Sequence, residues 1–86
     1  MNIHHNPDEV RFYIELEKGQ AVLEYQLLPA GRTSAVDKTV DFTRTYVPAE
    51  YRGRGYAEAL AKYGLNWAKK QGLKVKASCW YVRGFL

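Results

Sequence analysis

The feature that most constrains this chain is an Arg-Gly-Arg-Gly junction at residues 52–55, between a strand-like segment and a helix-like one. Its glycines let the backbone approach a ligand closely, because no Cβ stands in the way. The helix that follows offers unpaired N–H groups and the positive end of its dipole to an anion. None of residues 53–56 is Ser, Thr, Asp or Asn, whose side chains usually cap a helix, so water or a ligand must satisfy these groups. The junction therefore predicts a phosphate site, with Arg52 and Arg54 as charged donors.

Three known phosphate loops can be compared with this junction. A P-loop ends in Gly-Lys followed by Ser or Thr, and Arg54-Gly55-Tyr56 does not supply that ending. The dinucleotide fingerprint needs a further glycine where this chain has Glu58. The third pattern, Arg/Gln-x-x-Gly-x-Gly/Ala, is met by Arg52, Gly55 and Ala57. The alternative interpretation is a glycine-rich turn into a surface helix, with both arginines in water.

The spacing of apolar residues predicts strands before and after a helix. The first two strands form an antiparallel hairpin, and the last strand, helix and strand form a parallel β-α-β unit with a right-handed crossover. The expected fold class is α/β, or α+β with one parallel strand pair. The predicted elements are strands at Arg11–Glu17, Gln20–Leu28 and Thr39–Val47, a helix at about 57–71, and a final strand with Leu73, Val75, Ala77 and Cys79.

The same pattern predicts faces and boundaries. Pro48 ends the third strand because it has no N–H to donate, and Pro29-Ala30-Gly31 breaks the second. Residues 1–9 are polar and are expected to be a loose lead-in. Leu23, Tyr25 and Leu27 are expected to share one face of their strand, as are Val40, Phe42 and Tyr46. His4 and His5 have no predicted partner. Trp67 and Trp80 are expected as core or lid aromatics.

Length and composition limit the class of protein. The 86 residues suffice for one small domain, spanning 1–86, and a hydrophobic fraction of 47% indicates a folded chain. The lone Cys79 excludes an internal disulfide framework and a cysteine-rich zinc site, and it fits a reducing cytoplasm. No segment approaches the length of a membrane span, and no metal site is predicted. The net charge of +4 favours anionic partners.

Three segments together resemble the GNAT acyltransferase superfamily, specifically its minimal YjdJ-type N-acetyltransferase-like domains. Residues 44–48 read Arg-Thr-Tyr-Val-Pro, residues 50–55 read Glu-Tyr-Arg-Gly-Arg-Gly, and residues 73–82 read Leu-Lys-Val-Lys-Ala-Ser-Cys-Trp-Tyr-Val. The resemblance covers residues 40–83, and the preceding strands agree in number and order. One position departs from the pattern: Arg44 stands where the family usually has His.

The resemblance implies a compact GNAT-like fold whose parallel strands splay apart, and an N-acetyltransferase that moves an acetyl group from acetyl-CoA to an unidentified amine. The thioester would lie between the splayed strand ends. The backbone of Thr45, Tyr46 and Val47 would pair with the pantetheine arm. The pyrophosphate of coenzyme A would bind at Arg52, Gly53, Arg54, Gly55, Tyr56 and Ala57.

Cys79 and Tyr81 are the candidate catalytic residues. As a thiolate, Cys79 would accept the acetyl group and pass it on, with Lys74, Lys76 or Arg83 lowering its pKa. Tyr81 would protonate the departing sulfur. Each has a structural alternative: a small apolar filler for Cys79 and a packed aromatic for Tyr81. Glu24 and Glu50 are either bases or solvated surface carboxylates.

Other functions remain open from sequence alone. A coenzyme A-binding protein without transfer activity is the first alternative, since Arg44 cannot act as a base. A basic nucleic-acid-binding module is the second, although no recognised motif supports it. We expect acetyl-CoA and an unknown amine as partners, no membrane, and a monomer or a homodimer.

Overall fold

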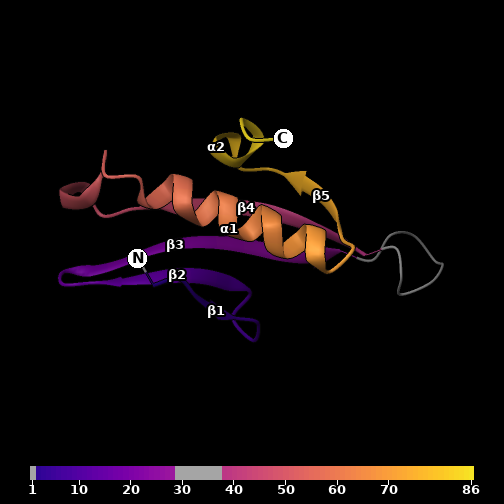
Figure 1. The fold of residues 1–86 in the computed structure, drawn as a ribbon, viewed down its shortest axis with the longest axis horizontal. Coiled ribbons are helices and arrows are strands. Elements are labelled where there is room, and N and C mark those ends of the chain that lie inside the picture. Colours follow the sequence, from indigo (N-terminus) through magenta and orange to yellow (C-terminus); the bar gives the residue numbers. More distant parts are fainter. Residues whose placement is uncertain (1, 29–37) are drawn as a thin grey trace.

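The computed structural model describes residues 2–28 and 38–86, and its centre is a five-stranded sheet in the order β1-β2-β3-β4-β5 (Figure 1). Neighbouring strands are antiparallel except β4 and β5, which are parallel. This confirms the predicted α+β class, with a hairpin joined to a β-α-β unit. The strands are β1 (His4–Asn6), β2 (Arg11–Leu16), β3 (Gly19–Leu28), β4 (Thr39–Tyr46) and β5 (Lys74–Ala77). The predicted break at Pro29-Ala30-Gly31 lies outside the described residues.

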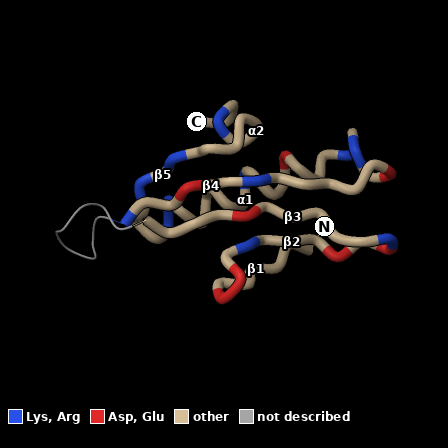
Figure 2. The backbone as a smooth tube through the Cα atoms, turned by 180° about the vertical axis from the view of Figure 1, so that it is seen from behind, with Lys and Arg blue, Asp and Glu red and all other residues tan. Residues whose placement is uncertain are grey.

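Helix α1 (Tyr56–Lys70) crosses one face of the sheet, over β3 and β4 (Figure 1). In the described part of the chain, no helix covers the opposite face (Figure 2). The short elements are the 3-10 turn η2 (Ala49–Tyr51) and α2 (Trp80–Arg83). Gly72, with a φ of 70°, follows α1 as the sequence predicted, because a left-handed residue ends a helix most easily as glycine.

The core lies between α1 and the sheet. Phe12, Leu23 and Phe42 from the strands meet Leu60 from α1, and all four are 0% exposed. Full burial of such side chains contributes about 1.5–3 kcal/mol each to folding. Gly64 lies at the centre of this contact and brings the helix close to β3 and β4.

The N-terminal segment is ordered, so the prediction of a loose lead-in is wrong for His4–Asn6. This segment pairs with β2, with His5 opposite Phe12. The His5 ring stacks on Phe12 with 4.2 Å between ring centres, and its Nε2 shares a 2.5 Å hydrogen bond with the Tyr25 hydroxyl. Trp67 of α1 meets the same ring edge-on. His4–Asn6 lacks the apolar alternation from which the other strands were predicted, and packing of the His5 ring against aromatic residues holds this strand in place instead.

A bulge in β4 changes which side chains face the core. Glu24 pairs with Arg44, but the next residue of β3, Tyr25, pairs with Phe42, which leaves Thr43 as an extra residue in β4. A one-residue insertion reverses the alternation of side chains. Tyr46, predicted to share the buried face of Phe42, is consequently 41% exposed. Leu27, which was predicted to share a face with Leu23 and Tyr25, is 45% exposed near the end of β3.

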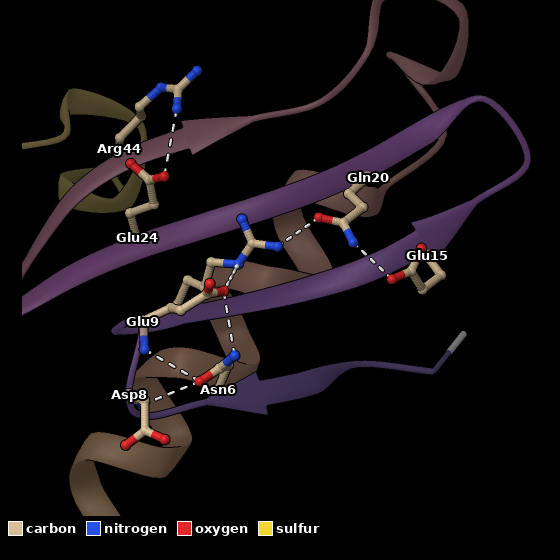
Figure 3. A network of polar contacts seen from close by, with 8 residues as sticks. Asn6, Asp8, Glu9, Glu15, Gln20, Glu24 and Arg44 are labelled. Carbon is tan, nitrogen blue, oxygen red and sulfur yellow. Dashed lines mark hydrogen bonds and ion pairs between the residues drawn. The ribbon is translucent and has the colours of Figure 1, made fainter.

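Polar side chains occupy the sheet face that α1 leaves uncovered (Figure 3). Asn6 Oδ1 accepts hydrogen bonds from the N–H groups of Asp8 and Glu9 and so closes the turn between β1 and β2. Arg11 donates to Gln20, at 2.6 Å, and Arg44 pairs with Glu24 at 3.5 Å. These contacts are partly exposed, so each contributes little stability, but together they keep this face polar.

Replacing Gly64 with alanine should destabilise the fold. A Cβ there would lie 2.8 Å from Leu23 Cδ2 and 2.9 Å from Phe42 Cε1, both in fully buried side chains. Overpacking of this kind costs about 1–3 kcal/mol, which outweighs the gain of up to about 1 kcal/mol in helix propensity. We expect Gly64→Ala to lower Tm in a thermal melt, whereas Asn66→Ala, at an exposed position of α1, should leave Tm unchanged or raise it. An unchanged Tm for Gly64→Ala would contradict the packing described above.

The half-buried imidazole of His5 should make stability depend on pH. Desolvation by burial lowers the pKa of His5 below its usual 6.5, so the unfolded chain binds this proton more readily than the folded one. Stability from His5 is therefore complete above about pH 6.5 and is lost as the pH falls towards the folded-state pKa. Denaturant melts between pH 7 and 5 should show this loss, and His5→Gln should remove it. His4→Gln, at the exposed neighbouring position, is the matched control. An acid limb that persists in His5→Gln would assign it to other groups.

Candidate functional site

The parallel strands β4 and β5 separate at one end, as predicted. Their pairing covers Thr39–Phe42 of β4, and the last bond runs from the Cys79 N–H to the Phe42 carbonyl at 2.9 Å. Past this point, β4 continues to Tyr46 with no β5 residue beside it. The final strand ends at Ala77 and not at Cys79, which corrects the predicted boundary; Cys79 is instead the N-cap residue of α2.

A cavity of about 640 Å³ opens at this separation, between the end of β4, the glycine loop and the start of α2. Cys79 and Tyr81 line it, together with all the predicted coenzyme A residues except Arg54. The structure thus gathers residues that are more than 30 positions apart in the chain, such as Thr45 and Cys79. The lining consists of Thr45, Tyr46, Val47, Tyr51, Arg52, Gly53, Gly55, Tyr56, Ala57, Glu58, Cys79, Trp80 and Tyr81.

The glycine loop requires glycine for its conformation. Gly53 and Gly55 have φ angles of 80° and 85°, in the left-handed region that other residues rarely adopt. Gly55 is the N-cap of α1, and no side chain caps the helix there. An added Cβ at either glycine would meet no atom within 4 Å, so space beside the loop is open. The first residues of α1, Tyr56, Ala57 and Glu58, line the cavity and their N–H groups have no side-chain cap, which suits a phosphate.

The two arginines of the loop lie differently. Arg52 lines the cavity, and its Nε donates a 2.9 Å hydrogen bond to the Val47 carbonyl, which ties the loop to the end of β4. Arg54 lies outside the lining, with its guanidinium carbon 5.5 Å from the centre of the Tyr51 ring. Arg52 is therefore the cation that the loop holds at the cavity.

The Cys79 sulfur lies 3.4 Å from the Thr45 hydroxyl oxygen, across the gap between the strands. Burial acts to raise the pKa of this thiol, but hydrogen bonds from Thr45 and from the backbone N–H groups of Val82 and Tyr81 act against it, and the pKa is lowered overall. The predicted help from Lys74, Lys76 or Arg83 is not what lowers the pKa, because the hydrogen bonds have that effect. The thiolate is accordingly favoured relative to an ordinary cysteine.

Tyr81 keeps its proton at neutral pH. Burial raises the pKa of its hydroxyl, and the charge of Glu58 raises it further, while Lys62 has the opposite effect. Glu58 and Lys62 form an ion pair at 2.8 Å on α1. A protonated phenol at the cavity wall is a suitable donor for a departing thiolate.

The sequence did not identify three lining residues, Tyr51, Glu58 and Trp80. Trp80 was expected as a core or lid aromatic; it lines the cavity and is 80% exposed, so it is not a core residue, whereas Trp67 packs against the core. Its position next to Cys79 was the available signal. Tyr51 and Glu58 flank the glycine loop, and only the fold shows that they face the same space.

Other sequence candidates lie away from the cavity. Arg44 and Glu24 pair with each other on the uncovered sheet face (Figure 3), so residue 44 does not line the cavity. Glu50 forms an exposed ion pair with Lys18 at 3.4 Å. Across residues 2–28 and 38–86, no three His, Cys, Asp or Glu side chains group as metal ligands do. No helix in those ranges combines the length and apolarity needed to cross a bilayer.

Curated relatives of this chain share a name. Protein NATD1 of Danio rerio is 34% identical over 88 aligned residues, which cover 100% of this chain and 74% of that protein. Protein NATD1 of Mus musculus is 32% identical over the same shares of both chains. The human protein NATD1 is 41% identical over 49 residues, 57% of this chain and 43% of its own.

A family model described as GCN5-related N-acetyl-transferase matches residues 11–86. The match includes β2 to β5, the glycine loop, α1 and α2. It begins after β1, and it contains every residue that lines the cavity. The chain belongs to the GCN5-related N-acetyl-transferase family.

Proposed function

We propose that this protein binds acetyl-CoA in the cavity between β4, the glycine loop and α2, and transfers the acetyl group to an amine. The single observation that carries the proposal is that one cavity joins an uncapped glycine loop to a thiol of lowered pKa. The loop supplies what a pyrophosphate needs, and the thiol supplies what acyl transfer needs.

The glycine loop would hold the pyrophosphate. No side chain caps the first-turn N–H groups of α1, and Arg52 contributes charged donors besides the Nε that bonds Val47. The unpaired edge of β4 at Thr45, Tyr46 and Val47 would add backbone hydrogen bonds to the pantetheine amides, as an extra strand would. Both groups line the same cavity, so one extended ligand can reach both.

Cys79 would carry the acetyl group. Acetyl-CoA supplies an activated carbonyl carbon. The Cys79 thiolate would form a bond to that carbon while the bond to the donor sulfur breaks, and Tyr81 would give its proton to the departing thiolate. An unprotonated amine would then bond to the same carbon, release the Cys79 thiolate and lose a proton to water or back to the Tyr81 phenolate. Thr45 would stabilise the thiolate at the start and the end of this cycle.

A coenzyme A-binding protein without transfer activity is the second candidate. An amine acceptor must lose a proton, and this candidate is favoured because the cavity offers few groups that could act as the base. Glu58 is the one carboxylate among the lining residues, and it is ion-paired with Lys62. Binding and transfer therefore need separate measurements.

The binding claim predicts a specific loss for Arg52→Ala. Removing this cation should weaken acetyl-CoA binding about tenfold, equivalent to about 1.4 kcal/mol, measured by isothermal titration calorimetry. Lys69→Ala, which removes an exposed charge from the far end of α1, should bind as the native chain does. Equal losses in both variants would mean that net charge, and not the loop, governs binding.

The transfer claim predicts an acetyl adduct on Cys79. Incubation with acetyl-CoA should release free coenzyme A thiol and add one acetyl group to the protein, seen by intact mass. Cys79→Ala should form no adduct although it still binds acetyl-CoA. An adduct of the same yield in Cys79→Ala would place the acetyl group elsewhere, and no thiol release with any of a panel of amines would leave the binding protein as the function.

A further inference from the structure

The end of β5 departs from a regular parallel ladder by one residue. Val40 pairs with Val75 and Phe42 with Ala77, and Lys74 N–H donates to the Lys38 carbonyl. In a regular ladder, the N–H of the residue after Ala77 bonds the Phe42 carbonyl. That residue is Ser78, but the Phe42 carbonyl accepts from Cys79 instead, at 2.9 Å.

The Asp41 carboxylate accepts the hydrogen bond from the Ser78 N–H, which a regular ladder would direct to the Phe42 carbonyl. Its Oδ1 accepts from the Ser78 N–H and its Oδ2 from the Ser78 hydroxyl, both at 2.8 Å. Asp41 is only 6% exposed. A carboxylate this buried is costly unless it is hydrogen-bonded, and the chemistry proposed above does not use it. Its place in the fold therefore needs another explanation.

We propose that Asp41 is a positioning residue for Cys79: by holding Ser78, it shifts the end of β5 by one residue and turns the Cys79 sulfur towards Thr45. A one-residue shift moves a side chain to the other side of a strand, so without this bond Cys79 would take a different direction. The inference rests on the proposed function only where it treats Cys79 as the acetyl carrier.

Arg83 supports the same turn from α2. Its Nε and Nη2 donate to the Ala77 carbonyl at 3.2 and 3.0 Å. The carbonyl of Ala77 and the N–H of Ser78, at the point where β5 leaves β4, are thus both bonded by side chains. Side chains therefore satisfy these two backbone groups of β5 at the point where the strand pairing stops.

The test reads the Cys79 thiol directly. Cys79 is the single cysteine of the chain, so the rate of alkylation by iodoacetamide as a function of pH reports on this thiol. The charged or titratable groups on the elements around it are Asp41 on β4, Arg52 in the glycine loop, Tyr81 and Arg83 on α2, and the Glu58–Lys62 pair on α1. Circular dichroism at each pH establishes that a variant is folded.

Asp41→Ala should raise the midpoint of the alkylation profile, because the thiol loses its alignment with Thr45 and with the N–H groups of α2. Asp41→Asn should give a smaller rise, because a neutral amide oxygen is a weaker acceptor than a carboxylate. Asp8→Ala removes an exposed aspartate and should keep the native midpoint. Removing a nearby negative charge would by itself lower the midpoint, so a rise reports on geometry.

An unchanged or lowered midpoint of the alkylation profile in folded Asp41→Ala overturns the proposal. If Asp41→Ala does not fold, an unchanged or lowered midpoint in folded Asp41→Asn overturns it instead. A fall in Tm without a change of midpoint would make Asp41 a purely structural residue, which also overturns it. The measurement contains no acetyl-CoA. A chain that failed to bind acetyl-CoA would therefore refute the proposed function and still give a readable result for Asp41.

Discussion

The contact between Gly64 of α1 and the ring of Phe42 is the constraint on which the rest of the structure depends. A Cβ at position 64 would lie 2.9 Å from Phe42 Cε1, so glycine is what lets α1 approach β4 this closely. The backbone of the same phenylalanine pairs with Tyr25 on one side and with Ala77 on the other. The bulge follows it at once, and its carbonyl makes the last bond to the β5 segment. Phe42 therefore belongs to the buried core, precedes the bulge in β4 and marks the start of the gap between β4 and β5.

The sequence predicted the long elements well because each has a strong periodic pattern and clear breakers. The hairpin, α1 and the parallel β4–β5 pair follow from alternation, from Gly72 and from Pro48. Two features carry no such pattern. The pairing of His4–Asn6 depends on rings contributed by β2, β3 and α1, which a local pattern does not show. The bulge at Thr43 depends on how β3 and β4 are aligned, and so the exposure of Tyr46 could not be read from β4 alone.

Prediction of the site succeeded where the chain itself encodes the geometry. The positive φ angles of Gly53 and Gly55 and the missing cap at Gly55 are local properties, visible as residue types. The surroundings of Cys79 are not local. Its thiol is influenced by Thr45 across the gap and by N–H groups of the short helix that follows, and not by the nearby lysines that the sequence suggested. The hydrogen bonds between Asp41 and Ser78 join residues 37 positions apart and have no sequence signature.

The gap beside β4 has a consequence for association between chains. Exposed strand edges are templates for other strands, and proteins commonly protect them by shortness, bulges and charge. Here the free edge runs only from Thr43 to Tyr46, contains the bulge and carries the Arg44 guanidinium. The shortness and the bulge that shape the cavity are thus also features that disfavour pairing of an edge with another strand. A groove can in this way open within a small sheet while the strand edge beside it stays short and irregular.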